Sequence, residues 1–411
     1  MPLPLFFADM PSSVPLWVPD ALTSAIKIFV VVNVILGLVS YAVLAERWIS
    51  AAIQDRVGPN RVGVPLGGVN VLGLFTIPKW TWWGLGQPLP DALKFMLKEE
   101  FTPAHVNKFY FWLAPAMAMV PALLTISVIP FASNHPITLP WGYTMKSPGM
   151  IADVNIGVLL VFAIASLSVY GIVLAGWASN SKYPFLGGIR SSAQMISYEV
   201  AMGLSVIPVF LVMGDLNLSG VVQYQTAHGW TVFPPINLLS ILSSSPNILI
   251  FSWTSFFLWI PMLLSFLVFM VSAFAETNRL PFDLPESETE LVGGYHTEYS
   301  AMKFALFFLG EYAAMIVASC LMVTLFFGGW SLPFGFYIDM QSHWWSLIIY
   351  PIVFLLKMCA FIVLFIWVRW TLPRFRYDQL MGLGWKCILP ISLANILFTG
   401  IVLALKQYFH P

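Results

Sequence analysis

The stretch 302–327, MKFALFFLGEYAAMIVASCLMVTLFF, decides the fold. Only Lys303 and Glu311 carry a formal charge within it, and most of the other residues are apolar. A helix needs about 20 predominantly apolar residues to cross the hydrocarbon core of a bilayer. The stretch also lacks the alternation of polar and apolar residues that a membrane barrel strand requires. The sequence therefore predicts a transmembrane helix here.

Seven further runs have the same character. The 411-residue chain is 59% hydrophobic and 9% charged, with a mean hydropathy of +0.82, whereas a soluble domain has about 25% charged residues. Because lipid offers the backbone no hydrogen-bond partners, each run is expected to be helical. We predict an all-α polytopic membrane protein with about eight transmembrane helices, near Ala25–Ala45, Phe109–Phe131, Val154–Ala178, Ala193–Met213, Ile248–Phe274, Met302–Phe327, Trp344–Trp367 and Trp385–Leu405.

Composition also excludes several function classes. The 19 basic and 19 acidic residues give zero net charge, so electrostatics does not support nucleic-acid binding. Cys320, Cys359 and Cys387 lie far apart, and the six histidines form no H-E-x-x-H motif. We therefore expect no metal site and no iron–sulfur cluster held by this chain alone.

Basic residues are unevenly distributed between the loops. Most Lys and Arg lie in or beside the loops after the first, third, fifth and seventh spans, including Lys182 and Arg190 after the third. The positive-inside rule then places these loops in the cytoplasm and both termini on the outer side. We treat residues 1–411 as one membrane domain with two long cytoplasmic loops, 46–108 and 275–300. Within the first, Asp91–Glu100 is predicted to form an amphipathic surface helix capped by Asp91.

Three charged residues lie well inside predicted spans, away from the span ends. Glu199 follows Tyr198 in the fourth span, Glu311 lies in the sixth, and Lys357 lies near the middle of the seventh. A charge at the centre of a membrane helix costs about 2.5–3.5 kcal/mol on insertion scales. These side chains should therefore face the bundle interior or a wet cavity. Each is either part of a charge pathway or an ion pair that only holds helices together, and the sequence leaves both open.

The loop after the fifth span is unusually acidic. Residues 275–294, AETNRLPFDLPESETELVGG, contain five carboxylates and one base, Arg279. Crowded, partly buried carboxylates cannot all ionise, so the pKa of some should rise toward neutrality, which suits proton exchange. An acidic surface that docks a basic partner explains the composition equally well. The carboxylates are Glu276, Asp283, Glu286, Glu288 and Glu290.

The end of the first span and the loop behind it form another charged segment. Glu46 and Arg47 end the span, and the loop continues as QDRVGPNRVG, residues 54–63. Its glycines and proline impose a defined non-helical backbone that presents Arg56 and Arg61. Such a loop suits a polar headgroup or the acidic surface of a partner, whereas an adjacent acid and base at a helix end is often only a solvated terminus.

These segments together resemble one family, the quinone-chamber membrane subunits of respiratory complex I, which are the H subunits of the proton-pumping NADH:quinone oxidoreductases. The resemblance covers most of the predicted cytoplasmic loops and span starts. The matching motifs are Glu46-Arg47, Gln54-x-Arg56-x-Gly58-Pro59-Asn60, Ala275–Arg279, Pro281–Asp283, Glu286-x-Glu288-x-Glu290-Leu291-Val292, Phe307-Phe308, Glu311-Tyr312 and Pro373–Met381. We expect the chain to be longer than usual members by several tens of residues, with the excess in a Trp-rich insertion at 65–86 near the quinone entrance and in the two outer loops, 215–247 and 328–343.

The resemblance implies a role for each matched residue. The helices and cytoplasmic loops would form much of a tunnel from the lipid to the site of quinone reduction. The quinone-tunnel residues would be Glu46, Arg47, Arg56, Arg279, Asp283, Phe308 and Arg369. The proton-path residues would be Tyr198, Glu199, Glu276, Glu286, Glu288, Glu290 and Glu311.

The resemblance also implies partners and a location. The chain would be a non-redox subunit of a translocase, without catalytic residues or activity of its own, and quinone would be the substrate. FMN, NADH and the iron–sulfur clusters would belong to partner subunits. The expected partners are hydrophilic quinone-site subunits, iron–sulfur subunits, small membrane subunits, antiporter-like subunits and lipids. The expected location is the cell inner (plasma) membrane.

Two other functions fit parts of the sequence. The equivalent subunit of a membrane-bound hydrogenase-type complex shares the bundle but need not use quinone; the complete arginine and acidic loops favour the quinone enzyme. A stand-alone ion transporter would use Glu199, Glu311 and Lys357 as coupling sites, but it has no reason to keep the loop motifs.

Overall fold

A computed structural model describes most of the chain. The described residues are 17–60, 70–71, 75–76, 84–133, 136–138, 144–145, 149–233, 253–285, 291–332 and 345–409. Within them, eight helical segments are long and apolar enough to cross a membrane, which confirms the predicted fold class.

Some of the eight spans are single helices and some are joined ones. The single helices are α1 (Trp17–Ile53), α6 (Lys182–Met213), α9 (Trp253–Glu276), α11 (Ala301–Phe326) and α12 (Ser346–Thr371). The joined spans are α3 (Lys108–Thr125) with the 3-10 turn Ile126–Val128, α4 (Gly157–Ala165) with α5 (Leu167–Ala178), and α13 (Tyr377–Gly382) with the π-helical segment Leu383–Ile388 and α14 (Leu389–Phe409).

Smaller elements lie between the spans. They are α2 (Pro88–Leu97), α7 (Leu218–His228) and the 3-10 turn Gly294–His296. Two antiparallel hairpins pair β1 (Asn70–Val71) with β2 (Phe75–Thr76) and β3 (Ile137–Thr138) with β4 (Thr144–Met145). Hydropathy alone gives residues 215–247 as a loop, so α7 was not predicted.

Several predicted spans were shorter than the helices in the structure. Helix α6 begins at Lys182, so Lys182 and Arg190 belong to the helix and not to a loop. Helix α12 likewise continues past Arg369. The prediction that Asp91 caps its helix was wrong, because α2 begins at Pro88 and a proline fits its first turn. A prediction from hydropathy ends a span where polar residues begin. The helix itself continues for as long as its backbone hydrogen bonds do.

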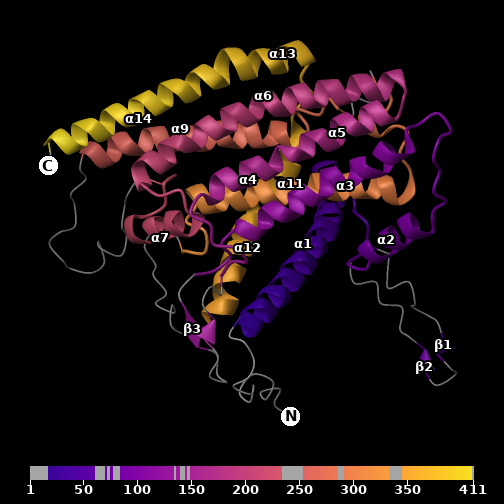
Figure 1. The fold of residues 1–411 in the computed structure, drawn as a ribbon, viewed down its shortest axis with the longest axis horizontal. Helices are drawn as coiled ribbons and strands as arrows, with labels where there is room; N and C mark the ends of the chain where they lie inside the picture. The colour runs from indigo at the N-terminus through magenta and orange to yellow at the C-terminus, as the bar shows by residue number, and fades with distance from the viewer. Residues whose placement is uncertain are drawn as a thin grey trace.

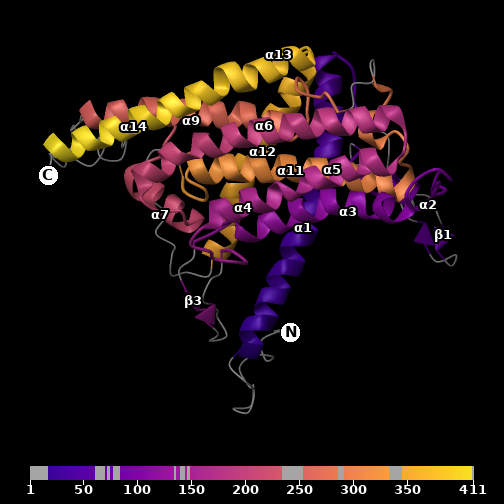
Figure 2. The same cartoon turned by 45° about the horizontal axis from the view of Figure 1, so that its top comes forward.

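The spans form a bundle with two oblique members. Helices α3, α5, α6, α9 and α11 run along the long axis, α14 packs on α6 and α9, and α1 and α12 cross the bundle at a steep angle (Figures 1 and 2). Helix α11 is the most enclosed: 72% of its most apolar window is buried, against 22% for α1. The stretch 302–327, most of which forms α11, thus lies at the centre of the fold.

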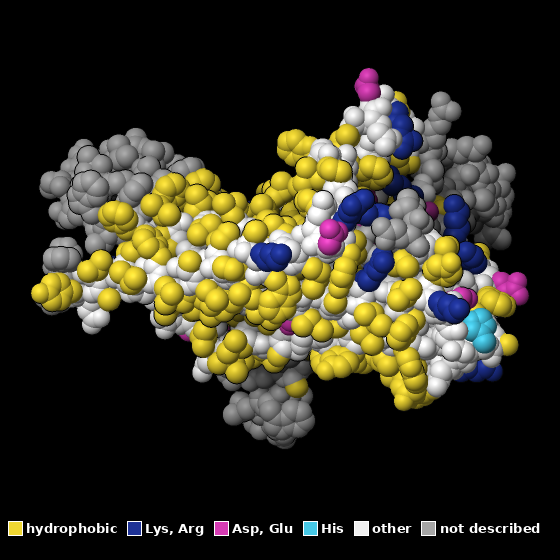
Figure 3. All heavy atoms as spheres, turned by 90° about the horizontal axis from the view of Figure 1, so that it is seen from above, with side chains coloured by type: hydrophobic (Ala, Val, Ile, Leu, Met, Phe, Trp, Pro, Cys, Tyr) yellow, Lys and Arg dark blue, Asp and Glu magenta, His cyan; other side chains and the backbone are white. Residues whose placement is uncertain are grey.

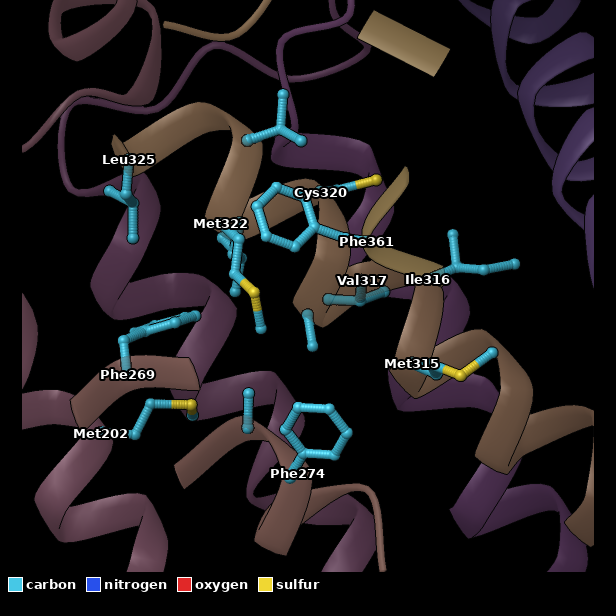
Figure 4. Packing of buried hydrophobic residues seen from close by; sticks show 14 of the residues in the cluster. Met202, Phe269, Phe274, Met315, Ile316, Val317, Cys320, Met322, Leu325 and Phe361 are labelled. Atoms are coloured by element: carbon cyan, nitrogen blue, oxygen red, sulfur yellow. The ribbon is translucent and has the colours of Figure 1, made fainter. Parts of the chain in front are cut away.

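The main apolar core surrounds the second half of α11. Met315, Ile316, Cys320 and Met322 pack there with side chains from α6, α9 and α12, as Figure 4 shows. The rings of Phe274 and Phe365 pack in a tilted arrangement with centroids 4.0 Å apart. Lipid provides no hydrophobic drive between helices, so this close packing and the polar contacts described below hold the bundle together.

The two ends of the bundle differ in charge. On the face shown in Figure 3, most Lys and Arg side chains gather at the end that carries α2, and apolar side chains cover the other part. The apolar cover is what a lipid-facing surface requires.

Candidate functional site

Glu46, near the end of α1, is the centre of a buried group of charges. It is 8% exposed. Arg369 of α12 donates from Nη1 to Oε1 of Glu46 at 2.5 Å, and Nη1 of Arg279 lies 3.5 Å from Oε2. The hydroxyl of Tyr312 on α11 donates to the same Oε2. One carboxylate thus joins three helices and a loop.

Arg279, three residues after the end of α9, extends the group. It is 3% exposed, its Nε lies 2.5 Å from Oε1 of Glu311, and its guanidinium lies 4.1 Å above the ring of Tyr312. Burial alone would lower the pKa of Arg279, but Glu311 and then Tyr312 and Glu46 raise it above the ordinary value. The guanidinium therefore stays charged at any physiological pH.

We call Glu46, Arg279, Glu311, Tyr312 and Arg369 the charge cluster. Its two acids and two bases balance, which is the condition under which ions can be buried without a prohibitive desolvation cost. Because the dielectric constant around buried groups is low, a charge placed nearby acts strongly on all of them. Such a cluster can pass an electrostatic signal from one end of the bundle to its interior.

A partly open cavity of about 80 Å³ adjoins the cluster. Glu276 and Glu311 both line it, with Thr125 and Asn278 among the other polar residues. The rest of its wall is mainly apolar and comes from α3, α4, α5, α6 and α11 and from the turn Gly294–His296. A cavity of this size has room for several water molecules, and its polar groups provide partners for them. The two carboxylates therefore line one cavity that water can fill.

The first half of the acidic loop is fixed to the bundle. The side-chain amide of Gln194, fully buried in α6, donates to the carbonyls of Ala275 at 2.7 Å and Phe282 at 2.8 Å. Asp283, 4% exposed, pairs with Arg374 at 3.0 Å. These contacts define the backbone that presents Arg279 to Glu46 and Glu311.

The other predicted tunnel residues lie outside this cluster. Phe308 packs its ring on Tyr312 at 4.8 Å and so borders it. Arg47 pairs with Asp91 of α2 at 2.8 Å and not with Glu46, because consecutive helix residues point in different directions. Arg56 is exposed and donates to Gln54 at 2.7 Å.

The predicted proton-path residues fall into three groups. Glu276 and Glu311 meet at the cavity. Tyr198 is fully buried and donates to the carbonyl of Leu380, and Glu199 beside it on α6 is partly buried. Glu286, Glu288 and Glu290 lie outside the described residues, as do most residues of the Trp-rich segment 65–86.

Sequence reasoning missed several residues of this region. Tyr312 and Arg374 stand inside motifs that were matched, but their chemistry was not assigned. Gln194 lies one turn before Tyr198 in a membrane helix. A polar residue there indicates a specific role for the same reason as Glu199, because lipid does not tolerate unpaired polar groups. Lys303 is 3% exposed and reaches Glu100 at 3.4 Å and Thr102 at 2.8 Å, whereas the sequence showed it only as a charge at the start of a predicted span.

Comparison with known proteins gives a family that covers nearly the whole chain. The profile of the family described as NADH dehydrogenase matches residues 26–400. The chain belongs to this family. It is 44% identical to an H subunit of the NADH-quinone oxidoreductase of Koribacter versatilis, over 94% of this chain and 98% of the relative. It is also 44% identical to an H subunit of the same enzyme from Geobacter metallireducens (94% and 99%) and to NADH-quinone oxidoreductase subunit 8 of Rhodothermus marinus (93% and 97%).

Family membership bears on two expectations. The relatives carry names of quinone oxidoreductase subunits, which favours that family over a hydrogenase-type complex or a stand-alone transporter. The expected excess length stays a prediction, because coverage of 97–99% of each relative and 93–94% of this chain also holds when residues are inserted within the aligned region.

Proposed function

We propose that the chain is the membrane subunit of a proton-translocating NADH:quinone oxidoreductase that forms much of the quinone tunnel and the first part of the proton-coupling path. The observation that carries the proposal is the match to H subunits of such oxidoreductases at 44% identity over nearly their full length. The chain itself contributes no redox centre, and NADH, FMN and iron–sulfur clusters belong to its partners.

The quinone tunnel is assigned to the side of the bundle that holds Glu46 and Phe308. A quinone tail needs an apolar passage with a few placed polar groups at the headgroup end. Arg369, Glu46 and Arg279 supply such groups, and the aromatic rings of Phe308 and Tyr312 lie beside them. Arg56, exposed on its glycine–proline loop, and the Asp283–Arg374 pair belong to the part that faces the hydrophilic partners.

The proton path is assigned to the carboxylates beyond Arg279. Reduction of a quinone to a quinol takes up two electrons and two protons. Until the protons arrive, the electrons leave negative charge on the headgroup, so the charge there changes during turnover. Arg279 touches Glu46 on one side and Glu311 on the other, and Glu311 shares the cavity with Glu276. A change of charge at Glu46 therefore alters the proton affinity of Glu311 and Glu276 through contacts of a few ångströms.

In this proposal the chain crosses the inner membrane, and both termini lie on its outer side. The basic end seen in Figure 3, which carries α2, then faces the cytoplasm, as the positive-inside rule requires. Hydrophilic quinone-site subunits cover that end, and small membrane subunits and antiporter-like subunits contact the apolar sides.

The test is made in the assembled, membrane-bound complex. Glu276→Gln and Glu311→Gln, each isosteric but unable to ionise, should lower quinone-reductase turnover by at least about tenfold, while NADH oxidation by a hydrophilic electron acceptor is unchanged. Glu99→Gln, at an exposed carboxylate outside the cavity, is the matched control and should leave both activities unchanged. Normal quinone reduction and proton pumping in both cavity variants would refute the assignment.

A further inference from the structure

Lys357 has no place in the proposed quinone and proton paths, yet it lies deep within a span. It is 11 residues into α12, about 17 Å along the helix from Ser346. Its Nζ donates to the carbonyl oxygens of Phe327 and Gly329, both at 2.8 Å, and to that of Ser331. It also lies 4.1 Å from the centroid of the Trp230 ring. The ammonium thus has three acceptors and an aromatic face.

The three carbonyls follow the end of α11. The chain leaves the helix through Gly328 and Gly329, which have φ of +67° and +52°, a region that glycine adopts without strain. The last carbonyls of any helix have no partner within it, and in lipid each must be satisfied by the protein. Lys357 satisfies the three carbonyls that follow the helix, close to the negative end of its dipole, where a cation is favoured.

Two neutral side chains complete the same cap. The amide of Gln225 on α7 donates to the carbonyls of Thr324 at 3.0 Å and Leu325 at 2.9 Å. The hydroxyl of Thr231 donates to those of Leu325 and Phe326. Lys357 is the member of this cap that comes from α12, so it ties the end of α11 to the middle of its neighbour.

The same two helices carry three members of the charge cluster: Glu311 and Tyr312 on α11, and Arg369 on α12. Tyr312 precedes Phe327 by 15 residues, about 22 Å along α11, and Arg369 follows Lys357 by 12 residues, about 18 Å along α12. Both side chains bind Glu46. Helices α11 and α12 are therefore bridged at two levels, through Lys357 at one and through Glu46 at the other. A slide of one helix against the other would strain both bridges.

We propose that Lys357 is a positioning residue that fixes the axial register of α11 against α12, so that Tyr312 and Arg369 both reach Glu46. The inference rests on the proposed function, because that function makes the geometry at Glu46 matter for quinone turnover. Its alternative is a lysine that stabilises the bundle without affecting the charge cluster.

The first test is kinetic and uses the assembled complex. Lys357→Met keeps an unbranched side chain but removes all three donors, Lys357→Arg keeps a cation with donors, and Leu356→Met is the control at the adjacent, 66% exposed residue. Lys357→Met should lower kcat for quinone by about tenfold or more, with KM changed less, because a displacement of about 1 Å can cost a hundredfold. Lys357→Arg should recover most of the loss, and Leu356→Met should show none.

The second test measures the register directly. Spin labels at Met302 and Trp370, which lie at the same end of α11 and α12 and are 40% and 41% exposed, report the distance between the helices in the full chain in micelles. The three native cysteines are replaced beforehand. The distance should shift by about 2 Å or more in Lys357→Met and return in Lys357→Arg. This measurement gives an answer even if a variant does not assemble.

The outcomes separate this inference from the proposed function. Unchanged kcat in assembled Lys357→Met, or an unchanged label distance, would overturn the positioning role. Arg369→Met in the same complex tests the cluster itself. If Arg369→Met lowers quinone turnover and Lys357→Met does not, only the role of Lys357 fails; if neither does, the proposed function fails.

Discussion

Glu46→Gln is expected to destabilise the folded chain by about 3–5 kcal/mol, the usual cost of removing one partner from a buried ion pair. The substitution preserves the shape of the side chain, and the new amide oxygen can still accept the Tyr312 hydroxyl. What changes is the charge: Arg279 and Arg369 then share Glu311 as the one acid left in the charge cluster. The cluster becomes a buried group with a net positive charge.

The distances show why both arginines depend on Glu46. With an effective dielectric constant of about 20, unit charges attract by about 7 kcal/mol at the 2.5 Å separation of Arg369 and by about 5 kcal/mol at the 3.5 Å of Arg279. The desolvation of Glu46, 8% exposed, offsets much of this attraction. In Glu46→Gln the attraction to the carboxylate is lost. Nothing then compensates for the desolvation of the two buried arginines.

A double-mutant cycle in micelles measures the effect. The full chain is unfolded by increasing SDS and followed by the fluorescence of its 17 tryptophans. Glu46→Gln and Arg369→Met should each destabilise, and the double variant should cost about 1–3 kcal/mol less than their sum. Glu99→Gln, at an exposed acid, serves as the control near zero. A loss below about 1 kcal/mol in Glu46→Gln, or strict additivity in the cycle, would refute the reasoning.

Two further predictions concern stability outside the charge cluster. Burial lowers the pKa of His296 to about 4, against 6.5 in the unfolded chain, so the unfolded state binds more protons between these values and stability should fall by up to about 3 kcal/mol as pH drops from 6.5 to 4. SDS unfolding at pH 7 and pH 4.5 measures this, and an unchanged pH dependence in His296→Gln would contradict it. Gly176→Ala should cost about 1–3 kcal/mol in the same assay, because the new Cβ would lie 2.6 Å from the carbonyl oxygen of Pro184. Gly203→Ala, with nothing within 4 Å, should be neutral or stabilising by up to about 1 kcal/mol, and equal losses in the two alanine variants would exclude the steric explanation.

The spans were predictable from the sequence because lipid imposes few choices. A long apolar run must satisfy its own backbone, so a helix follows from length and composition alone. The same reasoning located Glu199, Glu311 and Lys357 inside spans and required them to avoid lipid. It could not tell a charge pathway from a helix cap. In the structure Glu311 lines the cavity, and Lys357 binds backbone carbonyls at the end of α11.

The partners of each charge were decided only by the tertiary structure. Glu46 precedes Arg279 by 233 residues and Arg369 by 323, while the adjacent Arg47 points to α2. Local patterns report which side chains share a face of one helix, but ion pairing across helices depends on crossing angles and axial register, which arise from packing. The sequence thus determined that charges must be buried in lipid-spanning helices, and the arrangement of those helices determined which charges meet.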